Sequence, residues 1–229
     1  MRHRTKYFAW LAFSSFSILL LRAQIDSTPT TEFPRFRLIQ GKMDSDNLPI
    51  SGAKLCLLKP ENNCYSMPSN AGYSSSSVVY HYGLNPRSER LSLTGGGSLV
   101  FFSARFSGGG SGTLDSLAIL QYESDGKIVN LLPFVGLTNQ SDRALWNIRE
   151  ASSFPILVTA DFNWMEEEAH FAKHFYTVNV YHFDAQSHRY AKVFSYRTSK
   201  QYPGLDDADR VNVLKPEKAE ILRRLGTPY

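Results

Sequence analysis

Short apolar runs separated by turn-forming residues make up most of this sequence, and they limit the folds open to it. Residues 98–106 read SLVFFSARF between two glycine-rich segments, and residues 156–158 belong to a run that is apolar on both faces. Aromatic residues make up 13% of the chain, and aromatic side chains pack well on a pleated surface. From about residue 36 onward, the pattern predicts short β-strands joined by turns.

Two of these turns predict hairpins. Asp125 and Gly126 separate the strand-like residues 116–122 from residues 127–137. A tight type I′ turn needs positive φ at both central residues, and this dipeptide is one of those that such turns favour. Residues 184–188 separate two further runs of aromatic and β-branched residues, which predicts a second hairpin.

A short helix is predicted near the end of the chain, over residues 216–226. Pro216 suits the first turn of a helix, and Gly226 suits the position just past its end. Arg223 and Arg224 fall in the last turn, where the helix dipole favours cations. The expected apolar face consists of Ala219, Ile221, Leu222 and Leu225.

Consecutive hairpins followed by one helix predict a mainly β fold. Residues 36–226 are expected to form a single β-rich domain with antiparallel sheets and a short C-terminal helix. An antiparallel β-sandwich is favoured, and a propeller-like or partly closed barrel sheet is the alternative. Residues 141–152, SDRALWNIREAS, are a weaker candidate for a helical or irregular segment.

The N-terminal residues have the layout of a secretory signal peptide, predicted over residues 1–23. A basic start precedes an uncharged apolar run, residues 7–21, and Ala23 stands where cleavage is expected. That run is shorter than the roughly 20 residues of a bilayer-spanning helix. Leu21 is not a small residue, so an uncleaved anchor is the alternative. Residues 24–35 are polar and are expected to form a flexible leader.

The signal segment also accounts for the charge of the chain. Its basic residues, Arg2, Arg4, Lys6 and Arg22, equal the whole formal net charge of +4. The remainder is therefore formally neutral and shows no cluster of lysine and arginine, which nucleic-acid binding requires. The mature chain is expected to bind no nucleic acid and, once the signal is cleaved, to hold no stable membrane span.

Cys56 and Cys64 are the two cysteines of the chain. Export permits a disulfide, and the residues between them, LLKPENN, suit a hairpin or a looped bridge. We therefore predict that the two cysteines are bonded, with two free thiols as the alternative. Two cysteines alone cannot form a structural zinc site, which takes four ligands.

Residues 166–176, EEEAHFAKHFY, form the strongest candidate for a metal site. On a helix, His170 and His174 would be neighbours about 6 Å apart and could share an ion such as zinc. On a strand they would be about 13 Å apart and could not. Glu167, Asp161 or a remote histidine would supply a third ligand. The other interpretations are a solvated acidic turn followed by strand-edge histidines, or a pH-sensitive or ligand-contacting patch.

Other motifs fit known chemistry less well. The glycine-rich residues 107–113 lack the lysine of a phosphate-binding loop and are expected to form a flexible hairpin loop. Asp206, Asp207 and Asp209 lack the internal glycine and closing glutamate of a calcium loop, which favours a simple turn. No serine stands in the G-x-S-x-G motif of a nucleophile elbow.

Three stretches together resemble a group of uncharacterised secreted bacterial proteins with a β-rich C-terminal half. They are residues 145–164 (LWNIREASSFPILVTADFNW), 166–184 (EEEAHFAKHFYTVNVYHFD) and 192–207 (KVFSYRTSKQYPGLDD). The resemblance covers about residues 90–215 and implies bacterial export. It implies no activity and no catalytic residue.

These observations predict a secreted or periplasmic, non-enzymatic β-rich domain without a cofactor. Its expected partner is a protein, a glycan or a cell-envelope component, bound through aromatic surface and loops. The alternative is a metal-dependent hydrolase that holds zinc between His170 and His174, with Glu167 as ligand or base.

Overall fold

The computed structural model describes most of the chain beyond the N-terminal segment, and its elements lie in one compact unit, Phe33–Tyr229. The described residues are 34–59, 63–70, 79–94, 96–107, 113–148, 153–163, 169, 172–204 and 211–226. The predicted signal peptide and almost all of the predicted leader lie outside them. Within the described part of the chain, no helix has the length and apolar character needed to cross a membrane.

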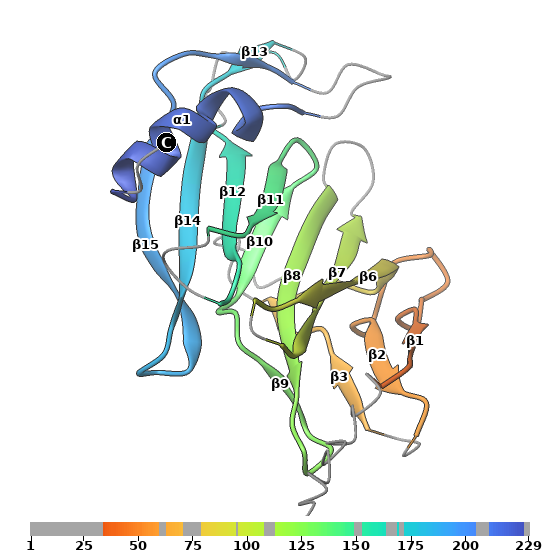
Figure 1. The fold of residues 1–229 in the computed structure, drawn as a ribbon. Helices are drawn as coiled ribbons and strands as arrows, with labels where there is room; N and C mark the ends of the chain where they lie inside the picture. The colour runs from red at the N-terminus through yellow and green to blue at the C-terminus, as the bar shows by residue number, and fades with distance from the viewer. Residues whose placement is uncertain are drawn as a thin grey trace, which may run out of the picture. The chain divides into compact units, whose positions relative to one another are not determined.

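The strands form three larger antiparallel sheets (Figure 1). The three-stranded sheet contains β1 (Phe36–Ile39), β2 (Lys54–Leu57) and β3 (Cys64–Ser66). The five-stranded sheet contains β6 (Leu84–Ser92), β7 (Ser98–Ser107), β8 (Thr113–Tyr122), β9 (Ile128–Asn130) and β10 (Val135–Thr138). The four-stranded sheet contains β11 (Asp142–Trp146), β12 (Ile156–Phe162), β14 (Tyr176–Asp184) and β15 (Arg189–Arg197).

Two short strand pairs and one helix complete the fold. The pairs are β4 (Ser69–Asn70) with β5 (Tyr80–His81), and β13 (Lys173–His174) with β16 (Tyr202–Pro203). The helix is α1 (Leu214–Arg224). The main path of each sheet is open, with β9 pairing with β8 beside the order β10-β8-β7-β6, and no described sheet closes on itself. The mainly β, sandwich-like architecture with a short C-terminal helix is therefore confirmed, and the propeller-like or partly closed barrel alternative is wrong for the described strands.

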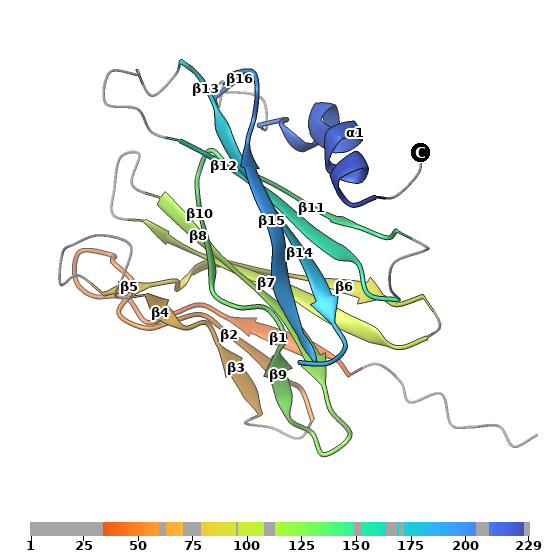
Figure 2. The same ribbon diagram turned by 90° about the vertical axis from the view of Figure 1, so that its left-hand side faces the viewer.

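Three apolar clusters hold the elements in layers. One lies between the five-stranded and four-stranded sheets and includes Phe101, Ile119 and Phe183. The second fills the space between the four-stranded sheet and α1, which Figure 2 shows beside that sheet. The third lies between the five-stranded and three-stranded sheets. Both larger sheets are therefore covered on both faces.

The layering explains the long apolar runs of the sequence. Strands of an antiparallel sheet usually alternate between core and solvent, whereas a strand covered on both faces reads as continuously apolar. In β12, Ile156 and Val158 pack toward α1, while Leu157 packs toward the five-stranded sheet. Next to β12, the Phe154 and Phe183 rings stack within the first cluster, with centroids 3.7 Å apart.

The first predicted hairpin is present between β8 and β9, but its turn type is wrong. Gly126 has φ 90°, whereas Asp125 does not have the positive φ that a type I′ turn requires. The Glu123 amide donates to the Lys127 carbonyl at 2.9 Å, and the Asp125 carboxylate accepts from the Lys127 amide at 2.9 Å. The second predicted hairpin, between β14 and β15, is confirmed.

Two other segments differ from their sequence predictions. Residues 127–137 form two strands instead of one, because the chain leaves the ladder after Asn130, whose side-chain oxygen accepts from the Ile119 and Leu132 amides at 3.1 Å each. Residues 141–152 contain a strand, β11, instead of a helix or irregular chain. β11 is stabilised by its pairing with β12, a contact that no local pattern reveals.

The helix is confirmed, and its buried face matches the predicted one only in part, at Ile221. Leu214, Glu217 and Ile221 are the buried residues, whereas Ala219 is exposed. The Glu217 carboxylate accepts hydrogen bonds from Tyr196, at 2.8 Å, and from Tyr202. Burial, with the bonds to this carboxylate as a second cause, raises the pKa of both phenols. A carboxylate is buried here because two strands supply its donors.

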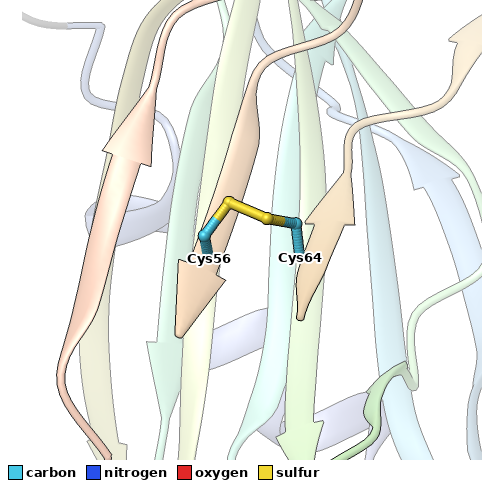
Figure 3. The surroundings of a disulfide bond; sticks show 2 residues. All are labelled: Cys56 and Cys64. Atoms are coloured by element: carbon cyan, nitrogen blue, oxygen red, sulfur yellow. A yellow bond between two sulfur atoms is a disulfide. The ribbon is translucent and has the colours of Figure 1, made fainter. Parts of the chain in front are cut away.

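The disulfide is confirmed. Cys56 on β2 and Cys64 on β3 lie directly opposite each other in the ladder, and their sulfur atoms are 2.03 Å apart (Figure 3). The bridge therefore links two neighbouring strands of the three-stranded sheet.

Candidate functional site

A cavity of about 540 Å³ lies between the five-stranded and four-stranded sheets. Its volume falls within the roughly 300–1,000 Å³ of pockets that bind small molecules. From the five-stranded sheet, it is lined by Phe134, Val135, Gly136 and Leu137. From the four-stranded sheet, it is lined by Thr159, Asp161, Phe162, Asn163, Thr177, Asn179 and Tyr181.

The register of β12 and β14 explains why this part of the interface is polar. Leu157 pairs with Tyr181, and both side chains belong to the apolar cluster between the sheets. Successive residues of a strand alternate between its faces, so the next pairs on this face lie two residues further along. These pairs are Thr159 with Asn179 and Asp161 with Thr177. The face that turns toward the five-stranded sheet thus changes from apolar to polar within a few residues.

Asp161 connects the two sheets at the cavity. One carboxylate oxygen, Oδ1, accepts from the Thr138 amide at 3.2 Å, the Thr138 hydroxyl, and the Phe162 amide at 3.2 Å. Thr138 is the last residue of β10, so these bonds hold the edge of the five-stranded sheet against β12. Burial raises the pKa of Asp161, and the hydrogen bonds from Thr138 and Phe162 act in the opposite direction.

The Thr159 hydroxyl is a second unusual polar group at this site. Thr159 lines the cavity and is fully buried, and its Oγ1 atom has no hydrogen-bond partner within the described structure. Buried polar groups are nearly always hydrogen-bonded. By contrast, the neighbouring Thr177 hydroxyl donates to Asn163 Oδ1 at 2.7 Å. Because the hydroxyl has no accessible surface, a ligand oxygen or amide in the cavity would bond to it once the cavity wall shifts.

The charged groups nearest the cavity are already paired. Arg105 forms two bonds to Asp115, at 2.7 and 3.1 Å, and Arg143 lies 3.7 Å from the same carboxylate. The exposed Lys192 ammonium lies 3.4 Å from Asn179 Oδ1. Among the described residues that line the cavity, none is cationic. The site therefore disfavours phosphates and other anions.

Aromatic rings flank the polar groups. Phe134 is 44% exposed and stands at the end of the segment that leads into β10. Tyr181 is buried, and burial raises the pKa of its phenol. Phe162 also lines the cavity. Hydroxyls, amides and one carboxylate between aromatic rings form a lining that can bind a hydroxyl-rich group by several hydrogen bonds and apolar contacts at once.

The histidine site predicted from the sequence is only partly within the described structure. His174 lies on β13 and is fully buried, with its ring centroid 5.1 Å from that of Phe162. His170 and Glu167 lie outside the described residues. Across the described ranges, no group of three potential metal ligands is close enough to hold an ion. The zinc site stays a prediction, which metal analysis of the purified protein tests.

Most of the other motifs singled out in the sequence fall on residues that the structure does not describe. Residues 108–112 of the glycine-rich stretch lie outside the described part of the chain, as do Asp206, Asp207 and Asp209. Asp161, a candidate third metal ligand, lines the cavity, and its role as a ligand stays a prediction.

Sequence reasoning missed Thr159, Thr177 and Asn179 as site residues. A signal was present, because polar residues occupy every second position in residues 159–163 and again at 177 and 179. Such alternation usually marks a solvent-facing surface. The sequence did not reveal that this face is turned toward a second sheet.

Comparisons with known proteins assign no family. No family model matches the chain, and no curated protein matches it. A solved structure described as "Crystal structure of CarG" aligns with 56% of this chain and 97% of its own, at 18% identity and a TM-score of 0.36. A likeness at this level identifies neither a fold family nor a function.

Proposed function

We propose that the chain is an exported, non-enzymatic binding domain that holds a hydroxyl-rich group of a glycan in the cavity between its two larger sheets. The observation that carries the proposal is the buried Thr159 hydroxyl, which lacks a partner in a cavity otherwise lined by polar and aromatic groups. A sugar hydroxyl both donates and accepts hydrogen bonds, so it can satisfy this group and its neighbours together.

The shape and charge of the site support a glycan over the other expected partners. Protein partners bury broad surfaces of about 800 Å² on each side, whereas the candidate site is a small concave space. Nucleic acids require cationic contacts to phosphate, and no described residue of the lining is cationic. Aromatic rings such as Phe134 offer the apolar surface on which a sugar ring can pack.

The disulfide supports export. Disulfides persist in oxidising compartments such as the periplasm and the extracellular space, and they are rare in the cytosol. Cys56 and Cys64 are bonded, and residues 1–23 have the layout of a signal peptide. Together these features favour a secreted or periplasmic location, where envelope glycans are available.

The lining favours binding over hydrolysis. Glycosidases generally use a pair of carboxylates that flank the glycosidic bond. Among the described residues that line the cavity, Asp161 is the one carboxylate.

The test is to titrate the purified mature protein with a panel of neutral oligosaccharides and follow amide chemical shifts by NMR. We expect shifts to concentrate on β10, β12 and β14. Thr159→Val removes the hydroxyl at nearly constant shape, and loss of one hydrogen bond should weaken binding about fivefold. Thr94→Val, at an exposed position, is the matched control. Absence of binding by every glycan, or equal binding by Thr159→Val, would overturn the proposal.

A further inference from the structure

We propose that the sugar unit held in this cavity carries a protonated amine, and that the amine pairs with the carboxylate of Asp161. The inference rests on the proposed function and narrows its substrate class from glycans in general to amino sugars with a free amine.

The two oxygens of Asp161 differ in how fully they are hydrogen-bonded. Oδ1 accepts from the Thr138 amide, the Thr138 hydroxyl and the Phe162 amide. Within the described structure, Oδ2 accepts a single long contact of 3.4 Å, from the Thr138 amide. A carboxylate offers about four acceptor positions. The acceptor capacity that is left at Asp161 therefore lies mainly on Oδ2.

Among the described residues, no cation pairs with the Asp161 carboxylate to compensate its charge. A buried carboxylate is costly unless it is paired, and a neighbouring cation normally supplies that pairing. Arg105 and Arg143 lie beside Asp115 instead, and Lys192 lies beside Asn179. The raised pKa of Asp161 follows from burial, and no cation is among its causes.

The groups that face Asp161 from the packed elements are neutral. Thr177 lies opposite it on β14, and Thr138 approaches from β10. Burial raises the pKa of the Tyr176 phenol, and the charges of Asp161 and Asp142 raise it further. A ligand ammonium would therefore meet one carboxylate among hydroxyl and amide groups. These neighbours suit the ring hydroxyls next to an amine.

The experiment compares two ligands that share one backbone. Oligomers of glucosamine carry free amines, and oligomers of N-acetylglucosamine of the same length carry neutral amides. The dissociation constants are measured by calorimetry with wild-type protein near pH 6. A charge-assisted hydrogen bond is about twice as strong as a neutral one, so we expect the free-amine oligomer to bind about tenfold more tightly.

The Asp161→Asn variant identifies the group responsible. Asparagine keeps an oxygen that can accept from Thr138, so the link between the sheets is preserved while the charge is lost. We expect this variant to fold and to bind both oligomers with similar affinity. Glu89→Gln removes an exposed carboxylate on β6, in the other sheet, and should keep the wild-type preference.

The outcomes separate this inference from the function on which it rests. If neither the acetylated nor the free-amine oligomer binds, both proposals fail. If wild-type protein binds the two oligomers equally, the proposed amine contact is wrong, whereas the proposed glycan binding still holds. A preference that survives in Asp161→Asn overturns Asp161 as the partner. If a small lysine peptide binds as tightly as the glucosamine oligomer, the sugar is not the source of the amine.

Discussion

At the residue scale, the buried Thr159 and the half-buried Asp161 show two ways in which one strand carries polar groups inside the fold. Asp161 gains hydrogen bonds from β10, whereas the Thr159 hydroxyl gains none. A buried donor or acceptor without a partner costs about 1–3 kcal/mol. Under the proposed glycan-binding function, a bond from the ligand to Thr159 would offset this cost.

The first prediction concerns the stability of Thr159→Val. Valine replaces the unpartnered hydroxyl by a methyl group of similar size, so the free energy of unfolding should rise by about 1 kcal/mol. Urea unfolding followed by fluorescence measures this change, with Thr94→Val as the control. A decrease in stability would mean that the hydroxyl has a partner in solution, and it would remove the basis for a ligand contact at this position.

The second prediction concerns the pH dependence of stability. Because burial raises the pKa of Asp161 above its ordinary value of 3.8, the native state binds a proton more readily than the unfolded state does. Stability contributed by this group therefore falls as pH rises from the ordinary pKa through the raised one. The Asp161→Asn variant lacks this slope. Urea unfolding of both proteins from about pH 4 to about pH 8 tests this expectation, and parallel profiles would contradict it.

At the element scale, α1 depends on residues remote in sequence for its hydrogen bonds. Its N-cap residue, Val213, makes no side-chain cap. The Asp142 carboxylate on β11 accepts from the Val213 and Leu214 amides instead, at 3.0 and 2.9 Å. A carboxylate at a helix N-terminus satisfies free amides and also interacts favourably with the helix dipole. The helix is thus capped by the edge strand of the sheet it covers.

The third prediction follows from this cap. Asp142→Ala should lower the free energy of unfolding by about 1 kcal/mol, a typical value for loss of an N-cap. Amide hydrogen exchange should speed up in the first turn of α1 before it changes in β7 or β8. Asp142→Asn should retain most of the stability, since its oxygen still accepts, and Glu89→Ala should leave it unchanged. Equal exchange in all four proteins would show that the cap contributes nothing.

At the scale of the whole molecule, the layers differ in how they are stabilised. The five-stranded and four-stranded sheets are covered on both faces by apolar clusters. The three-stranded sheet contributes one face to the third cluster, and several exposed apolar residues lie on or near its strands. They are Leu38, Ile39, Leu48, Ile50 and Leu58. The disulfide is located in this outer sheet.

The fourth prediction concerns that disulfide. Cys56 and Cys64 are eight positions apart, and a loop of this length predicts a stabilisation of about 2 kcal/mol. The free energy of unfolding of the double variant Cys56→Ala/Cys64→Ala, measured with denaturant, should be lower by this amount. Wild-type protein in reductant should show the same decrease. Hydrogen exchange should report faster opening of β1–β3 than of β7 and β8. Unchanged stability in both samples would contradict the prediction.

The sequence predicted those parts of the fold that local patterns determine. β7 and β12 contain the apolar runs 99–102 and 156–158, while Pro216 lies in the first turn of α1 and Gly226 follows its end. β6 was missed because its residues, LNPRSERLS, are polar and include a proline, which an edge strand tolerates. The burial of Glu217 was missed because its donors belong to β15 and β16.

The cavity escaped prediction for the same reason. Thr159 and Asn179 become neighbours through the register of β12 against β14, and Asp161 meets Thr138 only when two sheets pack together. Neither contact corresponds to a fixed spacing of residues along the sequence, so no sequence motif indicates it. Single residues such as Asp161 were recognised as chemically capable, but their partners were not.

The cap supplied by Asp142 also bears on the order in which the chain folds. An isolated helix the length of α1 is marginal in water, because its first turn is costly to form. Its partners, Asp142 and the two tyrosines that bind Glu217, belong to strands that precede it in the chain. The helix therefore lacks these hydrogen-bond partners until the strands have formed. We expect α1 to form after the rate-limiting step of folding. Folding φ-values near zero for Leu214→Ala and Ile221→Ala would show that the helix contacts form after the transition state. Values near one would show that they are already formed in it and would contradict this expectation.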